Sequence, residues 1–313
     1  MGSYILRRVC STVAVMAMVG IFVFLLLRLA PGDPAAMIAG KSASAEVIAR
    51  IRQQMGLNDS LPVQFMRWVH DILRGDLGTS IFAGRPVLEL ISQRLEPTLS
   101  LSILTMILSA TVGICFGIIA AWRAGGLEDR ILTGFATLGF SVPVFVVGFF
   151  LIYFFAIKAR WLPVQGYLPI GSGLWPWLMH LILPSVTLSI PYVAFIARIT
   201  RASMLEVLSE DYMRTAAAKG ASSYSMLFHH ALKNAGAPIL TVIGLSFAGL
   251  IGGVVITETV FNIPGAGRLV VDAINSRDYP VIQGVLVLVS GMYVLINLAI
   301  DLSYTLVDPR IRY

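Results

Sequence analysis

Apolar residues gather in six long runs along this chain, and shorter polar segments separate them. A helix needs about 20 apolar residues to cross a hydrocarbon core of about 30 Å, and each run has roughly that length. The pattern therefore predicts six transmembrane helices. Their approximate bounds are 9–29, 99–122, 132–157, 178–199, 238–257 and 281–307.

The composition changes the class of protein under consideration. The 313 residues are 57% hydrophobic and 13% charged, with a mean hydropathy of +0.82. A soluble domain of this length carries more charge, so the sequence predicts an all-α integral membrane protein. We attribute the formal net charge of +6 to membrane topology and contact with anionic lipid, and expect no nucleic-acid partner.

Basic residues predict the orientation, because Lys and Arg concentrate in short cytoplasmic loops. A cytoplasmic N-terminus places eleven such residues inside and four in the short outer loops. Both termini are therefore expected in the cytoplasm. The first run follows Arg7 and Arg8 but ends at Arg28 and Leu29, without a small-residue cleavage site, so we expect a retained helix.

The segment 31–97 is expected to be extracytoplasmic and helical. Ser44 is a predicted N-cap, with Glu46 in the first turn that follows. A second amphipathic stretch lies further along, and its predicted apolar face comprises Phe65, Trp68, Ile72 and Leu73. This pair of helices fits two interpretations. In the first it forms a surface that meets the membrane or a soluble partner, and in the second it forms a lid that packs over the ends of the transmembrane helices.

Candidate catalytic motifs are incomplete. The sequence Gly40-Lys41-Ser42 resembles the end of a phosphate-binding loop, but Ala35 stands where its first glycine is required. The stretch 244–248 resembles a serine-hydrolase elbow, but it lacks the last glycine, a preceding strand and a histidine base. Small-residue helix packing explains that stretch better.

Metal ligands are not indicated either. The histidines show no ligand spacing with acidic residues or cysteine; they are His70, His180, His229 and His230. Cys10 and Cys115 lie inside apolar runs, which predicts small buried side chains and no disulfide. We expect no metal or cofactor on this chain.

Small residues and prolines within the runs are expected to shape helix packing. GxxxG spacing relates Gly113 to Gly117 and Gly249 to Gly253, which predicts close backbone approach. The third and fourth runs are expected to be interrupted, so that a helix bends or lines a path. The prolines concerned are Pro143, Pro184 and Pro191.

Two carboxylates are candidates for membrane depth. Glu258 lies near the outer end of the fifth run, and Asp301 lies inside the cytoplasmic end of the sixth. Pairing with an arginine is favoured over a proton or ion relay, because both lie near an interface. With Pro143, they are candidate structural or gating residues.

The main polar interruption, residues 209–235, is expected in the cytoplasm. Ser209 is predicted to cap a short helix that ends at Lys219 and Gly220. Residues 215–218 give this helix little bulk, so another surface could approach its backbone. A second helix is predicted to restart after Ser222 and Ser223. Helices this short are marginal in water, so a partner or the membrane surface is needed.

The interruption resembles the cytoplasmic coupling loop of bacterial ABC importer permeases. Gly220 and Leu232 match that signature at its spacing, and Ala216 matches its second alanine. Arg214 and Thr215 stand in place of its glutamate and first alanine. The family signature is therefore only partly matched by the loop itself.

Further motifs, in order along essentially the whole chain, are similar to the dipeptide/oligopeptide-type branch of those permeases. They are LAPGDPA (29–35), RGDLGTSI (74–81), SEDYMRTAAAKG (209–220), GRLVVDAINSRDYPVIQG (267–284) and DPRIR (308–312). Ala217 departs from that branch, which commonly has arginine there. Any contact made by that arginine is therefore in question here.

The resemblance implies a multi-pass permease subunit of the bacterial inner (plasma) membrane. Its implied partners are a related second permease, two cytosolic ATPases that hold ATP and Mg²⁺, an extracytoplasmic solute-binding protein and membrane lipid. The implied solutes are dipeptides and oligopeptides, with glutathione, nickel complexes or another small solute as alternatives. The implied ATPase-coupling residues are Glu210, Asp211, Arg214, Thr215, Ala216, Ala217, Lys219, Gly220 and Leu232.

The expected organisation is a first transmembrane helix (1–30), the extracytoplasmic segment (31–97) and a permease core (98–313) with its coupling loop at 201–237. Two other classes fit less well. An intramembrane hydrolase lacks a nucleophile and base at plausible spacing, so we expect no enzyme. A self-sufficient carrier or channel is disfavoured because no carboxylate lies at the midplane and a docking loop would have no purpose.

Overall fold

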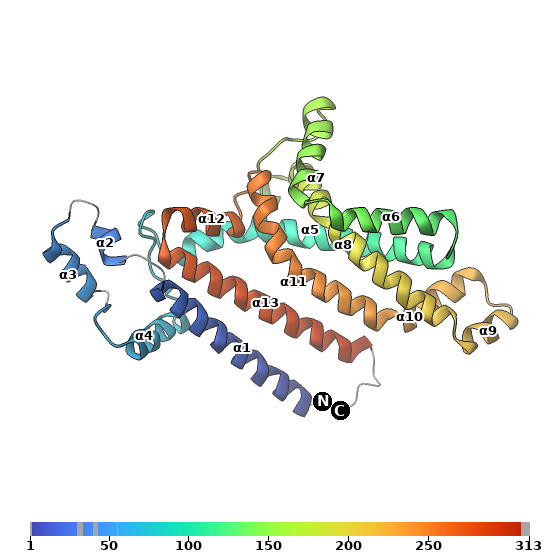
Figure 1. The fold of residues 1–313 in the computed structure, drawn as a ribbon, viewed down its shortest axis with the longest axis horizontal. Coiled ribbons are helices and arrows are strands. Elements are labelled where there is room, and N and C mark those ends of the chain that lie inside the picture. Colours follow the sequence, from blue (N-terminus) through green and yellow to red (C-terminus); the bar gives the residue numbers. More distant parts are fainter. Residues whose placement is uncertain (1, 30–33, 40–42, 55, 308–313) are drawn as a thin grey trace. The chain divides into compact units, whose positions relative to one another are not determined.

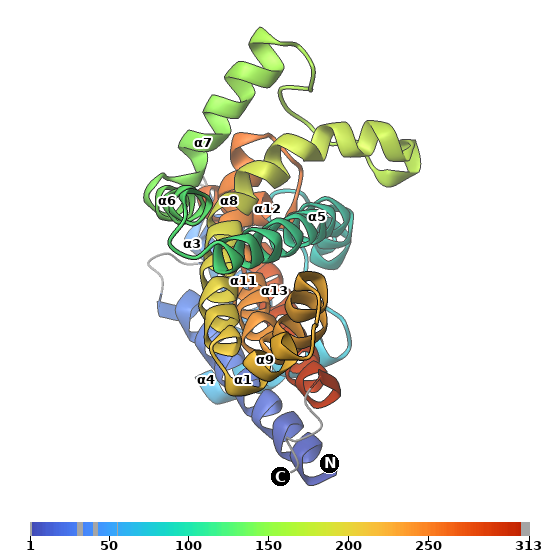
Figure 2. The same cartoon turned by 90° about the vertical axis from the view of Figure 1, so that its right-hand side faces the viewer.

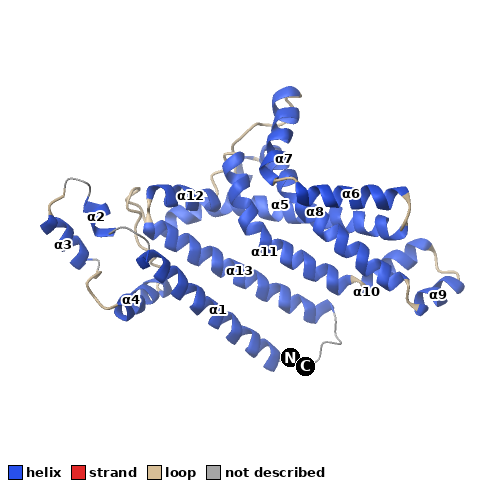
Figure 3. Cartoon of the chain, in the orientation of Figure 1, coloured by secondary structure: helices blue, strands red, loops and turns tan. Residues whose placement is uncertain are grey.

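The structure is a computed structural model that describes residues 2–29, 34–39, 43–54 and 56–307 (Figure 1). Within these residues regular secondary structure is helical, as Figure 3 shows, apart from one isolated antiparallel bridge between Thr79 and Pro86. The predicted all-α class is confirmed.

The chain divides into two compact units. Unit 1 comprises Met1–Leu95 with Leu269–Leu298, and unit 2 comprises Glu96–Arg268 with Ala299–Tyr313. Unit 1 contains α1 (Gly2–Leu29), α2 (Pro34–Ala39), α3 (Ala45–Gln54) and α4 (Leu61–Leu73). Unit 2 contains α6 (Leu127–Ser141), α7 (Val144–Leu151), the π-helix η1 (Ile152–Lys158), the 3₁₀ helix η2 (Ile170–Ser172), α8 (Leu174–Leu208), α9 (Asp211–Ala218), the π-helix η3 (Ser225–Ala231), α10 (Leu232–Asn234) and α11 (Gly236–Val260). The helices shared by both units are α5 (Val87–Trp122), α12 (Ala266–Ser276) and α13 (Tyr279–Val307).

Within unit 1, helix α4 packs on α1 through aromatic side chains. The ring centroid of Phe24 lies 5.3 Å from that of Phe65 and 5.7 Å from that of Trp68. The predicted apolar face is wrong at Leu73, which is 81% exposed. Leu73 is the last residue of α4, where the helix has passed the end of this contact. The predicted cap of α3 is confirmed by the Val47 N–H, 3.5 Å from Ser44 Oγ.

The start of α5 packs against α12 and α13 in the same unit. Val87, Ile91 and Val285 are fully buried there, with exposures of 0 to 1%. A Cβ added at Gly284 would lie 2.5 Å from Val87 Cγ1. Only glycine therefore fits at this crossing, which lets the two helices approach closely.

In unit 2, helix α8 lies against α5, α6, α7 and α11. A Cβ at Gly113 would come within 2.8 Å of Ile196 Cβ, and one at Gly117 within 2.8 Å of the Ala197 carbonyl oxygen. On the α11 side, a Cβ at Gly253 would lie 2.7 Å from the Leu188 side chain. The close backbone approach predicted from GxxxG is confirmed for Gly113 and Gly117, whereas Gly249 and Gly253 meet side chains of α8, including the Tyr192 ring 3.5 Å from a Cβ at Gly249.

Prolines act differently in the third and fourth runs. Helix α6 ends at Ser141, and after Val142 and Pro143 the chain restarts as α7 at an angle of 106° (Figures 1 and 2). By contrast, α8 continues through Pro184 and Pro191. The expected interruption of the fourth run is wrong, because neighbouring helices hold a proline-containing segment in place when it is buried among them.

Three described helices are long and apolar enough to cross a membrane: Val87–Trp122, Leu174–Leu208 and Tyr279–Leu298. The number rises to five if each of two bent pairs is one span, namely Leu127–Ser141 with Val144–Lys158 and Ser225–Asn234 with Gly236–Leu250. A shorter apolar helix, Cys10–Leu25, lies in the first run. The chain is thus multi-pass, and the six-helix count stays a prediction.

The predicted burial of both cysteines is wrong. Cys10 and Cys115 are exposed on their helices. An apolar helix in a membrane can turn small hydrophobic side chains toward lipid, so an apolar run does not imply burial within the protein. The two thiols are free.

Candidate functional site

The polar interruption folds as the predicted pair of helices, but it begins one residue later than expected. Helix α9 follows Glu210, whose backbone is extended (φ −68°, ψ 147°) as an N-cap requires. Ser209 ends α8 instead, and its hydroxyl donates to the Glu206 carbonyl at 2.7 Å. The predicted Ser209 cap is therefore wrong, because helical backbone at Ser209 turns the hydroxyl back toward α8.

The predicted stop at Gly220 is confirmed. Gly220 has φ +83°, a left-handed conformation that favours glycine. The Ala221 N–H donates to the Ala216 carbonyl at 3.1 Å, and the Gly220 N–H to that of Ala217 at 3.0 Å. These bonds satisfy carbonyls at the end of α9 and turn the chain sharply. The next helix begins at Ser223, one residue earlier than predicted, and the Ser222 hydroxyl accepts the Ser225 N–H at 3.3 Å.

One apolar side chain fixes α9 to the rest of unit 2. Met213 is 1% exposed, and it belongs to a buried cluster. The cluster comprises Ile118, Ala121, Met204, Met213, Ala231, Ala235 and Ile239, from α5, α8, α9, η3 and α11 and the residue before α11. Sequence reasoning missed Met213, although it is the one long apolar side chain in an otherwise small or polar helix. Burial of such a side chain contributes roughly 2 kcal/mol.

The surface of α9 that remains is small and polar, apart from Tyr212, which is 44% exposed. Seven of the nine predicted coupling residues are exposed: Glu210, Asp211, Arg214, Thr215, Ala217, Lys219 and Gly220. Ala216 is half-buried, and Leu232 packs against the Met213 cluster. Leu232 therefore supports this surface and does not form it. The side chains of Asn234 and Tyr212 join the two helices, with a 3.1 Å hydrogen bond from Nδ2 to the phenol oxygen.

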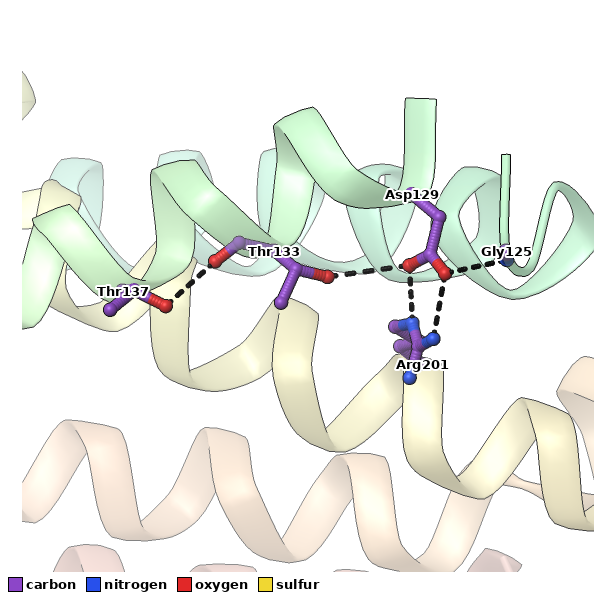
Figure 4. A network of polar contacts seen from close by, with 5 residues as sticks. All are labelled: Gly125, Asp129, Thr133, Thr137 and Arg201. Carbon is purple, nitrogen blue, oxygen red and sulfur yellow. Dashed lines mark hydrogen bonds and ion pairs between the residues drawn. The ribbon is translucent and has the colours of Figure 1, made fainter. Parts of the chain in front are cut away.

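A bidentate ion pair joins α6 to α8 in the same unit (Figure 4). Arg201 Nε lies 2.6 Å from Asp129 Oδ1, and Arg201 Nη2 lies 2.8 Å from Oδ2. The Gly125 N–H donates to Oδ2 at 2.9 Å, and the Thr133 hydroxyl lies 3.3 Å from Oδ1. The Asp129 side chain is 7% exposed. Sequence reasoning treated Arg201 only as a marker of orientation and missed this pair.

Glu258 is fully buried at the end of α11. The Thr98 hydroxyl donates to its Oε1 at 2.5 Å, and the main-chain N–H of Arg268 donates to its Oε2 at 2.9 Å. The Ala266 N–H in turn donates to Thr98 Oγ1 at 2.8 Å. A Cβ at Gly265 would overlap the carboxylate. The main-chain N–H of Arg268 thus helps to hold the carboxylate, and its guanidinium donates to the Asn262 side chain.

The remaining predicted site residues fall elsewhere. Pro143 is the N-cap of α7 and lies at the break between α6 and α7. The side chain of Asp301 lies outside the described residues. Among the residues that the structure describes, no group of three or more His, Cys, Asp or Glu is placed to hold a metal ion.

Two motifs that lie about 200 residues apart meet in unit 1. The Ser80 hydroxyl of RGDLGTSI donates to Asp278 Oδ2 at 2.5 Å, and the Ile81 N–H lies 3.3 Å from Oδ1. Both Ser80 and Asp278 are buried. This bond fastens the polar segment before α5 to the turn between α12 and α13, which sequence spacing alone did not indicate.

Comparison with known proteins agrees with this architecture. Residues 113–313 match the family described as binding-protein-dependent transport system inner membrane component. Residues 1–102 match the N-terminal domain of the same kind of transport component. Together, the two matches account for nearly the whole chain.

Named relatives and a solved structure are similar over most of the chain. The probable peptide ABC transporter permease protein y4tP of Sinorhizobium fredii is 72% identical over 313 residues, covering 100% of both chains. The glutathione transport system permease protein GsiC of Salmonella typhimurium is 44% identical over 311 residues, covering 99% of both.

A chain of the MetNI methionine ABC transporter, solved in inward-facing conformations, has a similar fold. The TM-score is 0.59 at 18% identity, over 71% of this chain and 97% of that chain. The fold, the family matches and the apolar helices agree with one another. This chain belongs to the family of binding-protein-dependent transport system inner membrane components, and it is a multi-pass permease subunit of an ABC transporter, not an enzyme.

Proposed function

We propose that this subunit imports dipeptides or oligopeptides and that the loop 209–235 couples it to cytosolic ATPases. The observation that carries the coupling role is the construction of α9. Apart from Tyr212, its exposed surface is small and polar, while Met213 anchors its other side in the cluster that also contains Met204 of α8. A partner that grips α9 therefore moves α8 with it.

The docking surface would consist of Thr215, Ala216 and Gly220, with charge contacts from Arg214 and Lys219. Small side chains let a partner approach the helix backbone closely, and exposed charges fix its orientation more than its affinity. ATP-driven closure of the ATPases would then shift α9, and the transmembrane helices would convert that shift into alternating access. Coupling requires the ATPases to hold the loop differently in their two states.

The proposed assembly contains this chain, a related second permease, two ATPases that bind ATP and Mg²⁺, and an extracytoplasmic solute-binding protein. We also propose six transmembrane helices with both termini in the cytoplasm. The proposed arrangement is a first helix at 1–30, an extracytoplasmic segment at 31–97, and a core at 98–313 with its coupling loop at 201–237. Pro143, Glu258 and Asp301 are proposed structural or gating residues.

Peptide is the proposed solute because a relative 72% identical over the whole chain is named a probable peptide permease. Glutathione is the leading alternative, since permeases named for it are 44% identical; nickel complexes are a further one. A binding assay with the solute-binding protein encoded beside this subunit tests the choice. Binding of dipeptides supports the proposal, and failure to bind any peptide contradicts it.

Two substitutions at one position test the docking surface in the complete transporter. Gly220→Trp places bulk where a Cβ meets nothing within 4 Å, so we expect loss of uptake and of co-purified ATPase with normal membrane insertion. Gly220→Ala is the matched control, because it shares the strain of φ +83° without the bulk. We expect Gly220→Ala to retain uptake.

Normal uptake by the tryptophan variant would contradict the proposed surface. Equal loss in both variants would also contradict it, because backbone strain would then be the cause. A self-sufficient carrier is excluded if the purified subunit fails to transport in liposomes until ATPases are added.

A further inference from the structure

We infer that Asp129 and Arg201 are positioning residues for coupling: their ion pair makes α6 follow α8, and so carries movement of α9 to the bent α6–α7 segment. This inference rests on the proposed coupling role of the loop 209–235. It adds a route by which a shift at that loop reaches helices that do not belong to the loop.

The first step of the route runs from α9 to α8. Met213 of α9 and Met204 of α8 share one buried cluster, with exposures of 1% and 0%. Arg201 lies one turn before Met204 on α8, so a rigid helix delivers the shift to Arg201 within about 5 Å. No flexible segment lies between Met204 and Arg201, since α8 is helical from Leu174 to Leu208.

The second step crosses from α8 to α6. Two parallel N–H···O bonds of 2.6 and 2.8 Å fix both the distance and the orientation of the two side chains. Asp129 is itself held by the Gly125 N–H, so the carboxylate cannot rotate away with its partner. The carboxylate is thus fixed at the start of α6, and the guanidinium reaches it from α8, as Figure 4 shows.

The ion pair lies near one end of α6, and a close contact with α8 lies near the other. There, a Cβ on Gly139 would lie 3.2 Å from Ala194 Cβ and 3.3 Å from Ile190 Cγ2. A cavity of about 280 Å³ adjoins both helices, and its lining includes Leu132, Thr133 and Ala136 of α6 and Ala197 and Arg198 of α8. Between these two contacts α6 also meets α5, because the ring centroid of Phe135 lies 5.8 Å from that of Phe116. Loss of the ion pair would therefore free mainly the Asp129 end of α6.

The first test uses Asp129→Asn and Arg201→Gln in the complete transporter. We expect solute transported per ATP hydrolysed to fall about tenfold, within the usual range of coupling between sites. Co-purification of the ATPases and membrane insertion should stay normal. Normal co-purification distinguishes a failure of this inference from a failure of the proposed docking surface, because loss of that surface would remove the ATPases from the purified complex. An unchanged transport ratio in both variants would overturn the inference.

Exchanging the two charges distinguishes a role of the ion pair in coupling from a merely structural role of either residue. Asp129→Arg combined with Arg201→Asp restores an ion pair in reverse, so the double variant should transport more per ATP than either single reversal. The recovery will be partial, because an arginine side chain in place of Asp129 cannot accept the bond that the Gly125 N–H donates. A double variant no better than the worse single variant counts against the pair.

Distance measurements test whether α6 follows α8 even where a variant inserts poorly into the membrane. Spin labels at Ile131→Cys, an exposed position at the Asp129 end of α6, and at Glu206→Cys on α8 report the separation of the two helices. Cys10→Ser and Cys115→Ser remove the exposed native thiols. We expect the same separation in the nucleotide-free and ATP-trapped transporter, and a nucleotide-dependent separation once Asp129→Asn is added. The inference is overturned if the separation changes between the two nucleotide states in the labelled transporter that keeps Asp129 and Arg201.

Discussion

Two buried carboxylates in unit 2, Asp129 and Glu258, are held in contrasting ways. Asp129 meets the guanidinium of Arg201, a side chain on another helix. Glu258 meets the Thr98 hydroxyl and the main-chain N–H of Arg268, in a turn where glycine leaves just enough room. Both carboxylates therefore connect two helices through a side chain, since Thr98 lies on α5 and Glu258 on α11. Glu258 in addition fixes the path of the chain after α11 through its main-chain partner.

This contrast determines what each site tolerates. The Asp129 pair can in principle be rebuilt with other charged side chains, because both members are side chains. The Glu258 site has no such freedom, since its partners include backbone that no substitution can replace. Leaving a buried carboxylate without its partners costs several kcal/mol, so damage at either site should lower stability. Damage at Asp129 should also lower coupling, because its partner Arg201 lies on the inferred route from α9.

The largest expected effect is that of Gly265→Ala. The new Cβ would overlap the Glu258 carboxylate, so we expect destabilisation of about 3 kcal/mol and little folded protein. Thermal unfolding of the purified transporter measures this. Gly134→Ala is the matched control, since nothing lies within 4 Å of its Cβ, and it should be neutral or slightly stabilising. Similar stability in the two variants would contradict the steric overlap expected between a Cβ at residue 265 and the Glu258 carboxylate.

Thr98→Val should have the next largest effect. It removes the hydroxyl that donates to Glu258 and accepts the Ala266 N–H, leaving two buried groups short of one bond each. We expect a loss of about 2 kcal/mol in thermal unfolding. Thr98→Ser keeps the hydroxyl and should lose less than half as much. Equal losses would show that the methyl group, not the hydroxyl, carries the stabilisation.

Arg201→Lys tests the two-bond geometry of the other carboxylate. Lysine keeps the charge but cannot form two parallel bonds to Asp129. We expect a stability loss of about 1 kcal/mol, smaller than that of Thr98→Val. Transport per ATP should fall to a value between those of the native protein and Arg201→Gln. A lysine variant that transports like the native protein would show that charge alone is sufficient.

The smallest expected effect on stability is that of Ala217→Arg, which places arginine where the related branch commonly has it. Ala217 is exposed on α9, so unfolding should change by less than about 0.5 kcal/mol. We expect more ATPase to co-purify, with a stronger dependence on salt. A clear loss of stability, or ATPase recovery unaffected by the substitution at any salt concentration, would argue against a docking role for this face.

Local signals in the sequence predicted the helical class, the break at Pro143, the two GxxxG contacts and the stop at Gly220. Each depends on a few neighbouring residues, such as a positive φ that only glycine adopts readily or a helix face of small side chains. The sequence therefore predicted where helices meet closely, although not which helix would be the partner.

The ion pair and the anchor of α9 depend on contacts that no local pattern contains. Arg201 lies 72 residues from Asp129, and Met213 is buried only because α5, α8 and α11 surround it. The errors at Ser209 and Leu73 have a related cause: a favourable residue type near a helix end does not fix the backbone conformation or the extent of the neighbouring surface. Exposure of Cys10 and Cys115 depends on lipid, which the apolar pattern does not separate from a protein core.

The contact at Gly117 limits the motions that are open to this bundle. A Cβ there would lie 2.7 Å from Thr200 Cγ2 and 2.8 Å from the Ala197 oxygen, so even an alanine would not fit in the contact between α5 and α8. We expect these two helices to move as one body. Opening and closing of this subunit would then take place around α5 and α8 together, at helices whose contacts are made by longer side chains.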